Sequence, residues 1–344
     1  MSDDTIQPMV QPTARNAEVR TTQDAREHLV AQARGSRVKI PDLQSLMAHW
    51  PQGVHPEKGR LGQDVEDILQ STFPDPKDEA RLSRLKASNF ALFGASWWPY
   101  SSYEALKTAI LLSIWMFIWD DETDSEQYSP LIHSFSNASA FREETVAYIQ
   151  ESLSEEEPRD GSTASSNPFI TRFGPVGRSI VNWGDQGQAE ADQTDRFLKE
   201  LVFFVEMTEE EHKSQTTSCL PTVEEYMVGA TIPKEAYHYE AMEVLWHETN
   251  VNISVTNDIL SMKKEIAQSQ VDSLVPLLFL RLGSLQAAVD HGGEMVKTSI
   301  RRIEEAEKDI LAKYPEESKS RQALKGYIDG CKYACTANLN WGQV

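Results

Sequence analysis

The chain has 344 residues, of which 40% are hydrophobic, and this composition supports a sizeable core and argues against global disorder. The formal net charge of -20 at pH 7 argues against nucleic-acid binding, because no basic surface is evident to neutralise phosphates, but it is compatible with binding cations. Three cysteines are too few for a disulfide framework and indicate a reducing compartment, so we expect a cytoplasmic protein.

The N-terminal segment, residues 1–36, is polar, rich in Thr, Gln and Arg, and lacks apolar periodicity. We expect a disordered leader there, without a signal peptide, followed by one folded domain over residues 37–344. The longest apolar run, Ala109 to Trp119, is too short to cross a bilayer and predicts a buried core helix, not a membrane span.

The remaining chain shows helical spacing of apolar residues throughout. Short helices reach about Thr72, and a helix over residues 78–93 is expected to end at the Gly94–Pro99 stretch. Ser101 or Ser102 is expected to cap the next helix, which runs into an acidic cluster. Further helices are predicted over residues 141–153, 168–183, 189–213, 222–227, 234–269, 274–312 (with a break at Gly292–Gly293) and 318–339. No strand alternation and no internal repeat is found, so the predicted fold is an all-α helical bundle.

The acidic cluster reads D-D-E-T-D from Asp120 to Asp124 and directly follows the apolar run. Asp120 and Asp124 are four residues apart, so they share a helix face on which their like charges repel unless a cation lies between them. Carboxylate oxygens suit Mg²⁺ or Mn²⁺ better than zinc. Ser113, Met116 and Phe117 lie one to two turns earlier on this face and are expected to line the space beneath the metal.

Two other interpretations of the acidic cluster fit the sequence less well. A solvated helix end is the common one, and it is disfavoured here by the preceding apolar run and by the lack of a basic partner nearby in sequence. An EF-hand fits poorly, because Ser125 stands where the loop needs Gly and Leu131 where it needs Glu.

A second polar cluster contains Asn257, Ser261 and Glu265, spaced four and four, which on a helix form one stripe of three oxygen ligands. Lys264 is adjacent to the last ligand and can reach an anion held by the metal. Taken alone the pattern is weak, since an exposed polar helix face has the same spacing.

Together the two clusters suit divalent cations around a diphosphate, where the cations neutralise charge on a leaving group. An aromatic cavity poor in water could then hold a carbocation. The candidate lining residues are Trp97, Trp98, Trp115, Phe117 and Trp341, although each of them is more often plain core.

These two motifs, D-D-E-T-D and N-D-I-L-S-M-K-K-E at residues 257–265, resemble those of class I terpene synthases, specifically fungal sesquiterpene synthases. The resemblance runs from about Lys39 to the end of the chain and includes W-P before the first motif and S-L-V-P-L-L after the second. It implies the α-helical fold of this family and Mg²⁺-dependent ionisation and cyclisation of farnesyl diphosphate to a C15 hydrocarbon or alcohol, with release of diphosphate. Geranyl and geranylgeranyl diphosphate remain alternative substrates, and the protein is expected to be a monomer or homodimer.

The resemblance also assigns roles by position. Asp120 would ligate two of three expected Mg²⁺ ions, with Asp121 and Asp124 as further metal ligands. Asn257, Ser261 and Glu265 would hold the third ion. Lys264 would contact diphosphate and is the catalytic candidate. The N-D-x-x-S form of the second motif argues against a chain-elongating prenyltransferase, which uses two aspartate-rich motifs.

Two departures from the family pattern stand out. Glu224-Glu225-Tyr226 is followed by Ala230 where the family has its diphosphate-sensing arginine, so a helical segment near residues 227–231 is expected to be missing. Arg196, Lys213 and Lys234 are the candidate substitutes. The Arg-Tyr pair that the family carries shortly after N-L-x-W is absent after Trp341.

Three hypotheses follow. The first is an active sesquiterpene synthase, favoured by the complete set of metal ligands. The second is a shortened protein of the same fold that binds Mg²⁺ and diphosphate but turns over weakly or not at all, favoured by the two departures. The third is a helical scaffold whose acids only confer solubility, and it requires both motifs to be coincidental.

Overall fold

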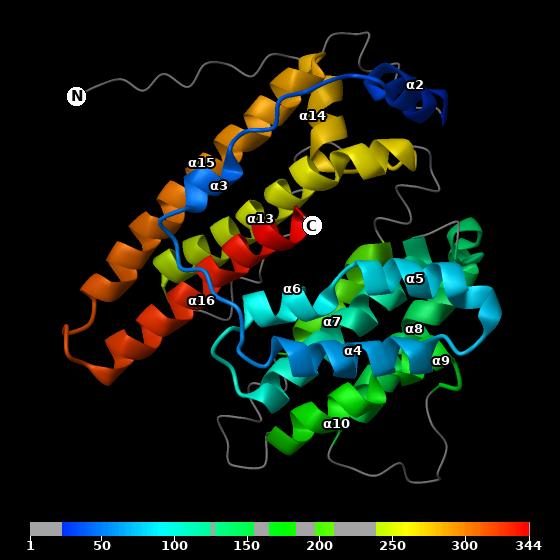
Figure 1. The fold of residues 1–344 in the computed structure, drawn as a ribbon, viewed down its shortest axis with the longest axis horizontal. Coiled ribbons are helices and arrows are strands. Elements are labelled where there is room, and N and C mark those ends of the chain that lie inside the picture. Colours follow the sequence, from blue (N-terminus) through cyan, green and yellow to red (C-terminus); the bar gives the residue numbers. More distant parts are fainter. Residues whose placement is uncertain (1–22, 125–127, 155–164, 184–196, 210–238, 344) are drawn as a thin grey trace. The chain divides into compact units, whose positions relative to one another are not determined.

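The computed structural model describes residues 23–124, 128–154, 165–183, 197–209 and 239–343, and within these ranges the regular structure is helical, with no strand (Figure 1). The chain forms two compact units. The first combines Met1–Leu46 with Ser218–Ala306, and the second combines Met47–Thr217 with Glu307–Val344.

The second unit carries the acidic cluster. Its described helices are α4 (Lys58–Thr72), α5 (Glu79–Ala87), α6 (Phe90–Trp97), α7 (Tyr103–Asp124), α8 (Phe135–Ser152), α9 (Pro168–Thr171), α10 (Gly174–Trp183) and α16 (Lys319–Gly342), together with the 3₁₀ turns Pro76–Asp78 and Leu131–His133. Residues 197–209 are helical as well, and the predicted apolar face of this segment packs into the core through Leu201 and Val205.

Helix α7 lies between two hydrophobic cores, which explains why it is apolar around its whole circumference. Ile110, Ile114 and Ile118 pack into the core formed with α4, α5 and α6. Trp115 and Trp119 pack into the other core, formed with α8, α9, α10 and residues 197–209. The buried indole N–H groups are satisfied, because Trp119 Nε1 donates to Thr145 Oγ1 at 2.9 Å and Trp115 Nε1 donates to the Phe169 carbonyl at 2.9 Å.

The N-terminal end of α7 is anchored to α4. Ser102, one of the two predicted caps, accepts a hydrogen bond from the Ala105 amide at 3.3 Å. The Tyr103 hydroxyl donates to Asp64 Oδ2 at 2.7 Å, and Lys107 Nζ lies 2.9 Å from the same oxygen. Burial and the bond to Asp64 raise the pKa of Tyr103 to about 12, so the hydroxyl remains a donor at physiological pH.

The break predicted at Gly94–Pro99 occurs at Trp98, directly after the end of α6 at Trp97, and an earlier break that was not predicted separates α5 from α6. Helix α5 ends at Ala87, and α6 starts after Asn89, whose φ of 50° is left-handed and whose side chain caps α6 at the Leu92 amide, 3.3 Å away. Gly94 sits inside α6, where a Cβ would lie 3.0 Å from Ile110 Cδ1. The glycine therefore allows α6 to approach α7 closely and does not end a helix.

The first unit carries the second polar cluster. Its helices are α2 (Gln23–Ala33), α13 (Glu240–Ala267) and α14 (Leu274–Leu282), and α3 (Leu43–Met47) and α15 (Leu285–Ala312) cross the boundary between the units in sequence. The predicted break at Gly292–Gly293 is wrong. The chain turns instead at Gly283, which has φ 69° and ends α14, while a Cβ on Gly292 would lie 3.1 Å from Ile259 Cδ1 of α13. Gly292 thus serves close packing of two helices.

The leader prediction needs a correction for residues 23–33, which form α2. Leu29 and Val30 are buried and pack with Val271 and Leu277. The partners of this short apolar stripe lie some 240 residues later in the chain, so local periodicity did not reveal it. Residues 1–22 lie outside the described part of the chain.

A buried polar stripe ties α13 to α15. Glu248 Oε1 lies 2.7 Å from Arg302 Nη1, and Asn252 Nδ2 donates to Ser299 Oγ at 2.9 Å. Glu248 and Asn252 are one helical turn apart, so both contacts fix the same face of α13.

In the described residues no helix combines the length and the apolar character needed to cross a membrane.

We predict that Gly94→Val destabilises the protein by about 1–3 kcal/mol, because the added side chain overpacks the contact between α6 and Ile110 of α7. Thermal unfolding followed by circular dichroism measures the effect. The matched control is Gly62→Ala in α4, where the new Cβ meets only Ala91 at 3.8 Å and helix propensity favours alanine. Equal melting temperatures for Gly94→Val and the parent protein would contradict the close packing of α6 on α7.

Candidate functional site

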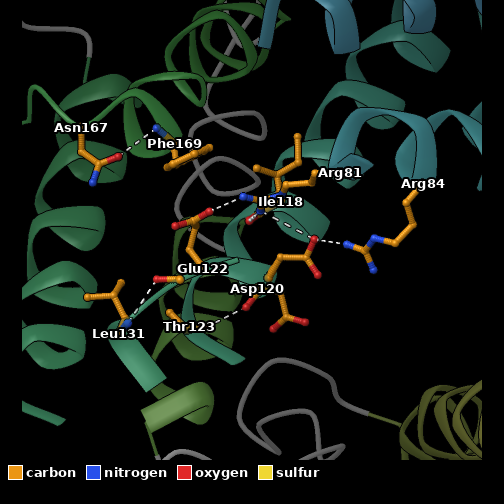
Figure 2. A network of polar contacts seen from close by, with 11 residues as sticks. Arg81, Arg84, Ile118, Asp120, Glu122, Thr123, Leu131, Asn167 and Phe169 are labelled. Carbon is orange, nitrogen blue, oxygen red and sulfur yellow. Dashed lines mark hydrogen bonds and ion pairs between the residues drawn. The ribbon is translucent and has the colours of Figure 1, made fainter. Parts of the chain in front are cut away.

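The acidic cluster occupies the C-terminal end of α7 (Figure 2). Asp120 is half-buried, and the side chains of Asp121 and Glu122 are 19% and 10% exposed. Thr123 Oγ1 donates to the backbone carbonyl of Asp120 at 3.1 Å. Asp124 is the last residue of the helix, and its side chain lies outside the described part.

Two arginines of α5 bind this helix end. Arg81 Nη1 lies 2.5 Å from Glu122 Oε1, and Arg81 Nη2 donates to the Ile118 carbonyl at 3.1 Å. Arg81 Nη2 also lies 3.6 Å from Asp121 Oδ2, to which Arg84 Nη2 donates directly. In Figure 2 the Asp120 carboxylate lies apart from both guanidinium groups.

Aromatic rings surround the arginine pair. The Arg81 guanidinium carbon lies 4.9 to 5.3 Å from the ring centres of Tyr128, Phe73 and Phe169. Arg84 lies 4.7 Å from the Tyr128 ring. A cation held over aromatic faces and paired with carboxylates tolerates burial, and Arg81 is only 5% exposed.

The environment of Glu122 is correspondingly unusual. Burial raises the pKa of Glu122 above its ordinary value, while the hydrogen bond and charge of Arg81 oppose the shift. The sequence showed no basic partner near this cluster because the arginines lie 37 and 41 residues earlier. A usable signal was present in R-L-S-R at residues 81–84, where two arginines three apart share a helix face with apolar neighbours.

The second polar cluster lies on α13 as one connected stripe. Ser261 Oγ donates to the Asn257 carbonyl at 2.8 Å and contacts Glu265 Oε1. Glu265 Oε2 accepts a hydrogen bond from Ser273 Oγ at 2.6 Å. Asn257 is exposed, whereas Ser261 and Glu265 are half-buried. Hard oxygen donors already in mutual contact fit the preference of Mg²⁺, so this donor set is compatible with the implied metal.

Lys264 and Asp258 lie on either side of this stripe. Lys264 is exposed next to Glu265, as its proposed contact with an anion requires. Asp258 is 3% exposed, and its Oδ2 accepts a hydrogen bond from the Leu274 amide at 2.8 Å, at the first residue of α14. The aspartate of N-D-x-x-S therefore holds the N-terminus of the following helix, a role that the sequence did not reveal.

Three predicted pocket residues gather around Phe93, a residue that the sequence analysis did not predict as part of the pocket. The ring centres of Trp97, Trp341 and Phe117 lie 4.9, 5.0 and 6.3 Å from that of Phe93. Trp341 Nε1 donates to the Ser88 carbonyl at 2.5 Å, which fixes α16 against the start of α6. Phe117 is 40% exposed, one turn before Asp120, so this aromatic cluster reaches the surface near the acidic helix end.

The other predicted lining residues have different surroundings. Ser113 Oγ donates to the Ala109 carbonyl of its own helix at 2.9 Å. Met116 and Trp115 pack in the core with α8, α9 and α10, while Trp98 packs in the core with α4, α5 and α6. Trp115 is only 3% exposed and is therefore a core residue.

The possible substitutes for the sensing arginine, at positions 196, 213 and 234, lie outside the described residues, as does the 227–231 segment. Among the side chains that the structure describes, no three His, Cys, Asp or Glu residues gather as a metal-holding group. The proposed metal ligands also include Asn257 and Ser261, which are not among these four residue types, and Asp124, whose side chain the structure does not describe.

Sequence comparison matches residues 226–302, which contain the second cluster, to the terpene synthase family 2, C-terminal metal binding model. The sesquiterpene cyclase hepA of Aspergillus oryzae is 28% identical over 88% of this chain and 86% of its own length. The terpene cyclase braA of Annulohypoxylon truncatum is 25% identical over 92% of this chain and 88% of its own length.

Solved structures show the same fold at low sequence identity. A hedycaryol synthase in complex with HEPES is 16% identical, with a TM-score of 0.68 over 89% of this chain and 99% of that one. The linalool/nerolidol synthase of Streptomyces clavuligerus is 18% identical, with a TM-score of 0.68 over 89% of this chain and 100% of that one. The fold is therefore the all-α fold of class I terpene synthases.

We predict that Asp258→Ala lowers the free energy of unfolding by about 1–2 kcal/mol, because the Leu274 amide loses its buried acceptor at the start of α14. Asp258→Asn keeps an acceptor oxygen and should cost less. Urea unfolding measures both variants, with Asp309→Ala at an exposed position of α15 as the control. If Asp258→Asn lowered the free energy of unfolding as much as Asp258→Ala, the hydrogen bond from the Leu274 amide would not account for the lost stability.

Proposed function

Because the chain belongs to the terpene synthase family, we propose that it is a sesquiterpene synthase that ionises farnesyl diphosphate and cyclises the C15 chain with release of diphosphate. The observation that carries the proposal is the connected oxygen stripe of Asn257, Ser261 and Glu265 on α13, inside the segment that matches the metal-binding family model. The similarity to curated cyclases over most of the chain supports the reaction class.

The charged and polar residues have the following proposed roles. Asp120, Asp121 and Asp124 would ligate metal at the end of α7. Asn257, Ser261 and Glu265 ligate a further ion, and Lys264 contacts the diphosphate. Three Mg²⁺ ions are expected, with Mn²⁺ as an alternative, and when bound they neutralise the charge that develops on the departing diphosphate. The oxygen donors of α13 are held ready by Ser273, whose hydroxyl orients Glu265.

The aromatic cluster has a separate proposed role. Phe117, Trp97, Phe93 and Trp341 offer an apolar surface one turn from Asp120, suited to binding a prenyl chain and keeping water from it. Aromatic faces also attract a carbocation, so the same rings can stabilise the ion left after diphosphate departs. Trp341 joins this surface from α16, which makes the last helix part of the proposed site.

The alternative is a member of the family that binds Mg²⁺ and diphosphate without efficient turnover. The absence of the family's arginine after Glu224-Glu225-Tyr226 favours it, since that residue helps to ionise the substrate. The two functions differ in whether product forms, not in whether metal binds.

We predict that the purified full-length chain, incubated with farnesyl diphosphate and Mg²⁺, forms a cyclic C15 hydrocarbon or alcohol, and that EDTA abolishes it. Gas chromatography with mass detection of the organic extract is the measurement. The control is an EDTA-treated sample with Mg²⁺ restored in excess, which should recover the product. Absence of product from folded protein that is still stabilised by Mg²⁺ and inorganic diphosphate would favour the non-catalytic alternative.

We predict that Asp120→Asn and Asn257→Leu each lower turnover about 100-fold or more, because each removes a proposed metal ligand. Circular dichroism should show unchanged helical content. Asp309→Asn, at an exposed position of α15, serves as the control and should retain the parent rate. An unchanged rate for either site variant would refute the metal assignment at that residue.

A further inference from the structure

We infer that the segment from Leu29 to Pro41, which we call the N-terminal strap, holds the turn between α13 and α14 in place. Val30 and Arg34 of this strap act through the turn as positioning residues for Glu265. The inference rests on the proposed function, because Glu265 is one of the proposed metal ligands. The strap and the turn both belong to the first unit, so they lie in the same compact part of the chain.

The first contact between the strap and the turn is apolar. Leu29 and Val30 on α2 are 2% and 5% exposed, and they share a hydrophobic cluster with Val271, which is fully buried. Val271 lies in the turn between α13 and α14. Two residues further on, Ser273 Oγ donates to Glu265 Oε2 at 2.6 Å. Helix α2 therefore covers the turn close in sequence to the hydroxyl group that orients Glu265.

The second contact is polar and lies at the C-terminal end of α13. Arg34 Nη2 donates to the carbonyl of Ala267, the last residue of that helix, at 3.4 Å. Carbonyl groups in the last turn of a helix have no partner within the helix, and the helix dipole favours a cation there. Arg34 therefore caps α13 from a position 233 residues earlier in the chain.

The backbone of the turn explains why it benefits from an outside contact. Ser269 has a φ of 62°, which lies in the left-handed region. Its amide donates to the Ile266 carbonyl at 3.3 Å, and the Gln270 amide donates to the Glu265 carbonyl at 2.9 Å. Helix α13 thus ends in a Schellman motif, which usually has glycine at the left-handed position. A side chain raises the free energy of this conformation, so contacts from the strap help to maintain it.

The other end of the strap is fastened to α15. The Lys39 amide donates to Gln286 Oε1 at 2.8 Å, and Gln286 Nε2 donates to the Lys39 carbonyl at 3.0 Å. Pro41 lies against Gly293, where an added Cβ would be 2.7 Å from Pro41 Cγ. Figure 1 shows the segment after α2 following α15. Because α15 fixes one end of the strap, the other end can hold the turn.

Val30 and Arg34 can be varied separately. Val30→Ala shortens a buried side chain in the cluster with the turn, and its matched control is Val296→Ala, at a fully buried valine of α15 whose carbonyl binds Ser299. Arg34→Gln removes the cation at the end of α13, and its control is Arg37→Gln, at another exposed arginine of the strap. Arg34→Lys is the conservative variant.

Two properties of the full-length protein are measured. Hydrogen–deuterium exchange of residues 268–276 without Mg²⁺ reports how readily the turn opens, and this readout requires no metal. The Mg²⁺ concentration at the half-maximal rise in melting temperature, at a fixed concentration of inorganic diphosphate, reports on the orientation of the proposed ligands. The melting temperature without Mg²⁺ records any loss of overall stability separately.

We expect Val30→Ala and Arg34→Gln each to speed exchange in the turn about 10-fold, because each removes a contact that opposes local opening. Both should raise the half-maximal Mg²⁺ concentration about 3-fold or more, since groups that orient a ligand contribute to metal affinity. Arg34→Lys should keep most of the protection, because a cation remains at the helix end. Val296→Ala should lower the melting temperature without changing either readout, and Arg37→Gln should behave as the parent protein does.

Three results would contradict the inference. If Val30→Ala and Val296→Ala changed exchange in the turn equally, the strap would contribute only to overall stability. If exchange in Arg34→Gln matched that in Arg37→Gln, Arg34 would not hold the turn. Faster exchange with an unchanged Mg²⁺ response would show that the turn does not position Glu265.

Failure of the proposed function gives a different result. A parent protein that shows no response to Mg²⁺ and diphosphate would overturn the proposed function and, with it, the positioning of a metal ligand. The exchange measurement would still decide whether the strap holds the turn, because it is made without metal.

Discussion

The acidic end of α7 depends on the contacts of one buried guanidinium group, that of Arg81. It joins α5 to Glu122, to Asp121 and to the Ile118 carbonyl, and it lies among three aromatic rings from separate segments of the chain. Such a buried charge is tolerated only while its partners are present, and removing one partner from a buried pair typically costs about 3–5 kcal/mol. The position of this helix end is thus set by a small group of contacts that all meet at one residue.

Three different kinds of contact hold helix α7 at its first turn, its middle and its last turn. Its first turn is anchored to α4 through Tyr103 and Asp64, its middle is buried between two apolar cores, and its last turn is bound by α5. A helix held in this way has little freedom to rotate about its axis. Side chains at its C-terminal end are therefore presented in fixed directions, which supports the proposal that they bind cations.

The second polar cluster shows how residues proposed as metal ligands can also stabilise the fold. Ser273 and Leu274 both begin α14, and they bind Glu265 and Asp258 of α13 respectively. The α13–α14 turn is therefore held by two carboxylates from the N-D-x-x-S motif and its extension. This explains why S-L-V-P-L-L follows the motif in the sequence: the serine and the first amide of the new helix supply the donors that orient the acids.

The sequence by itself determined the all-α fold, the two polar clusters, and the spacing that brings Asn257, Ser261 and Glu265 onto one face of a helix. These features depend on local periodicity, which a linear sequence shows directly. The tertiary structure decided what the sequence could not: Arg81 and Arg84 as partners of the acidic cluster, Phe93 at the centre of the aromatic cluster, α2 in the expected leader, and Gly94 and Gly292 as packing positions within helices. Each of these depends on contacts with residues outside the local segment. A glycine can end a helix, as Gly283 does, or let two helices pack closely, as Gly94 and Gly292 do, and only the packed neighbours distinguish the two roles.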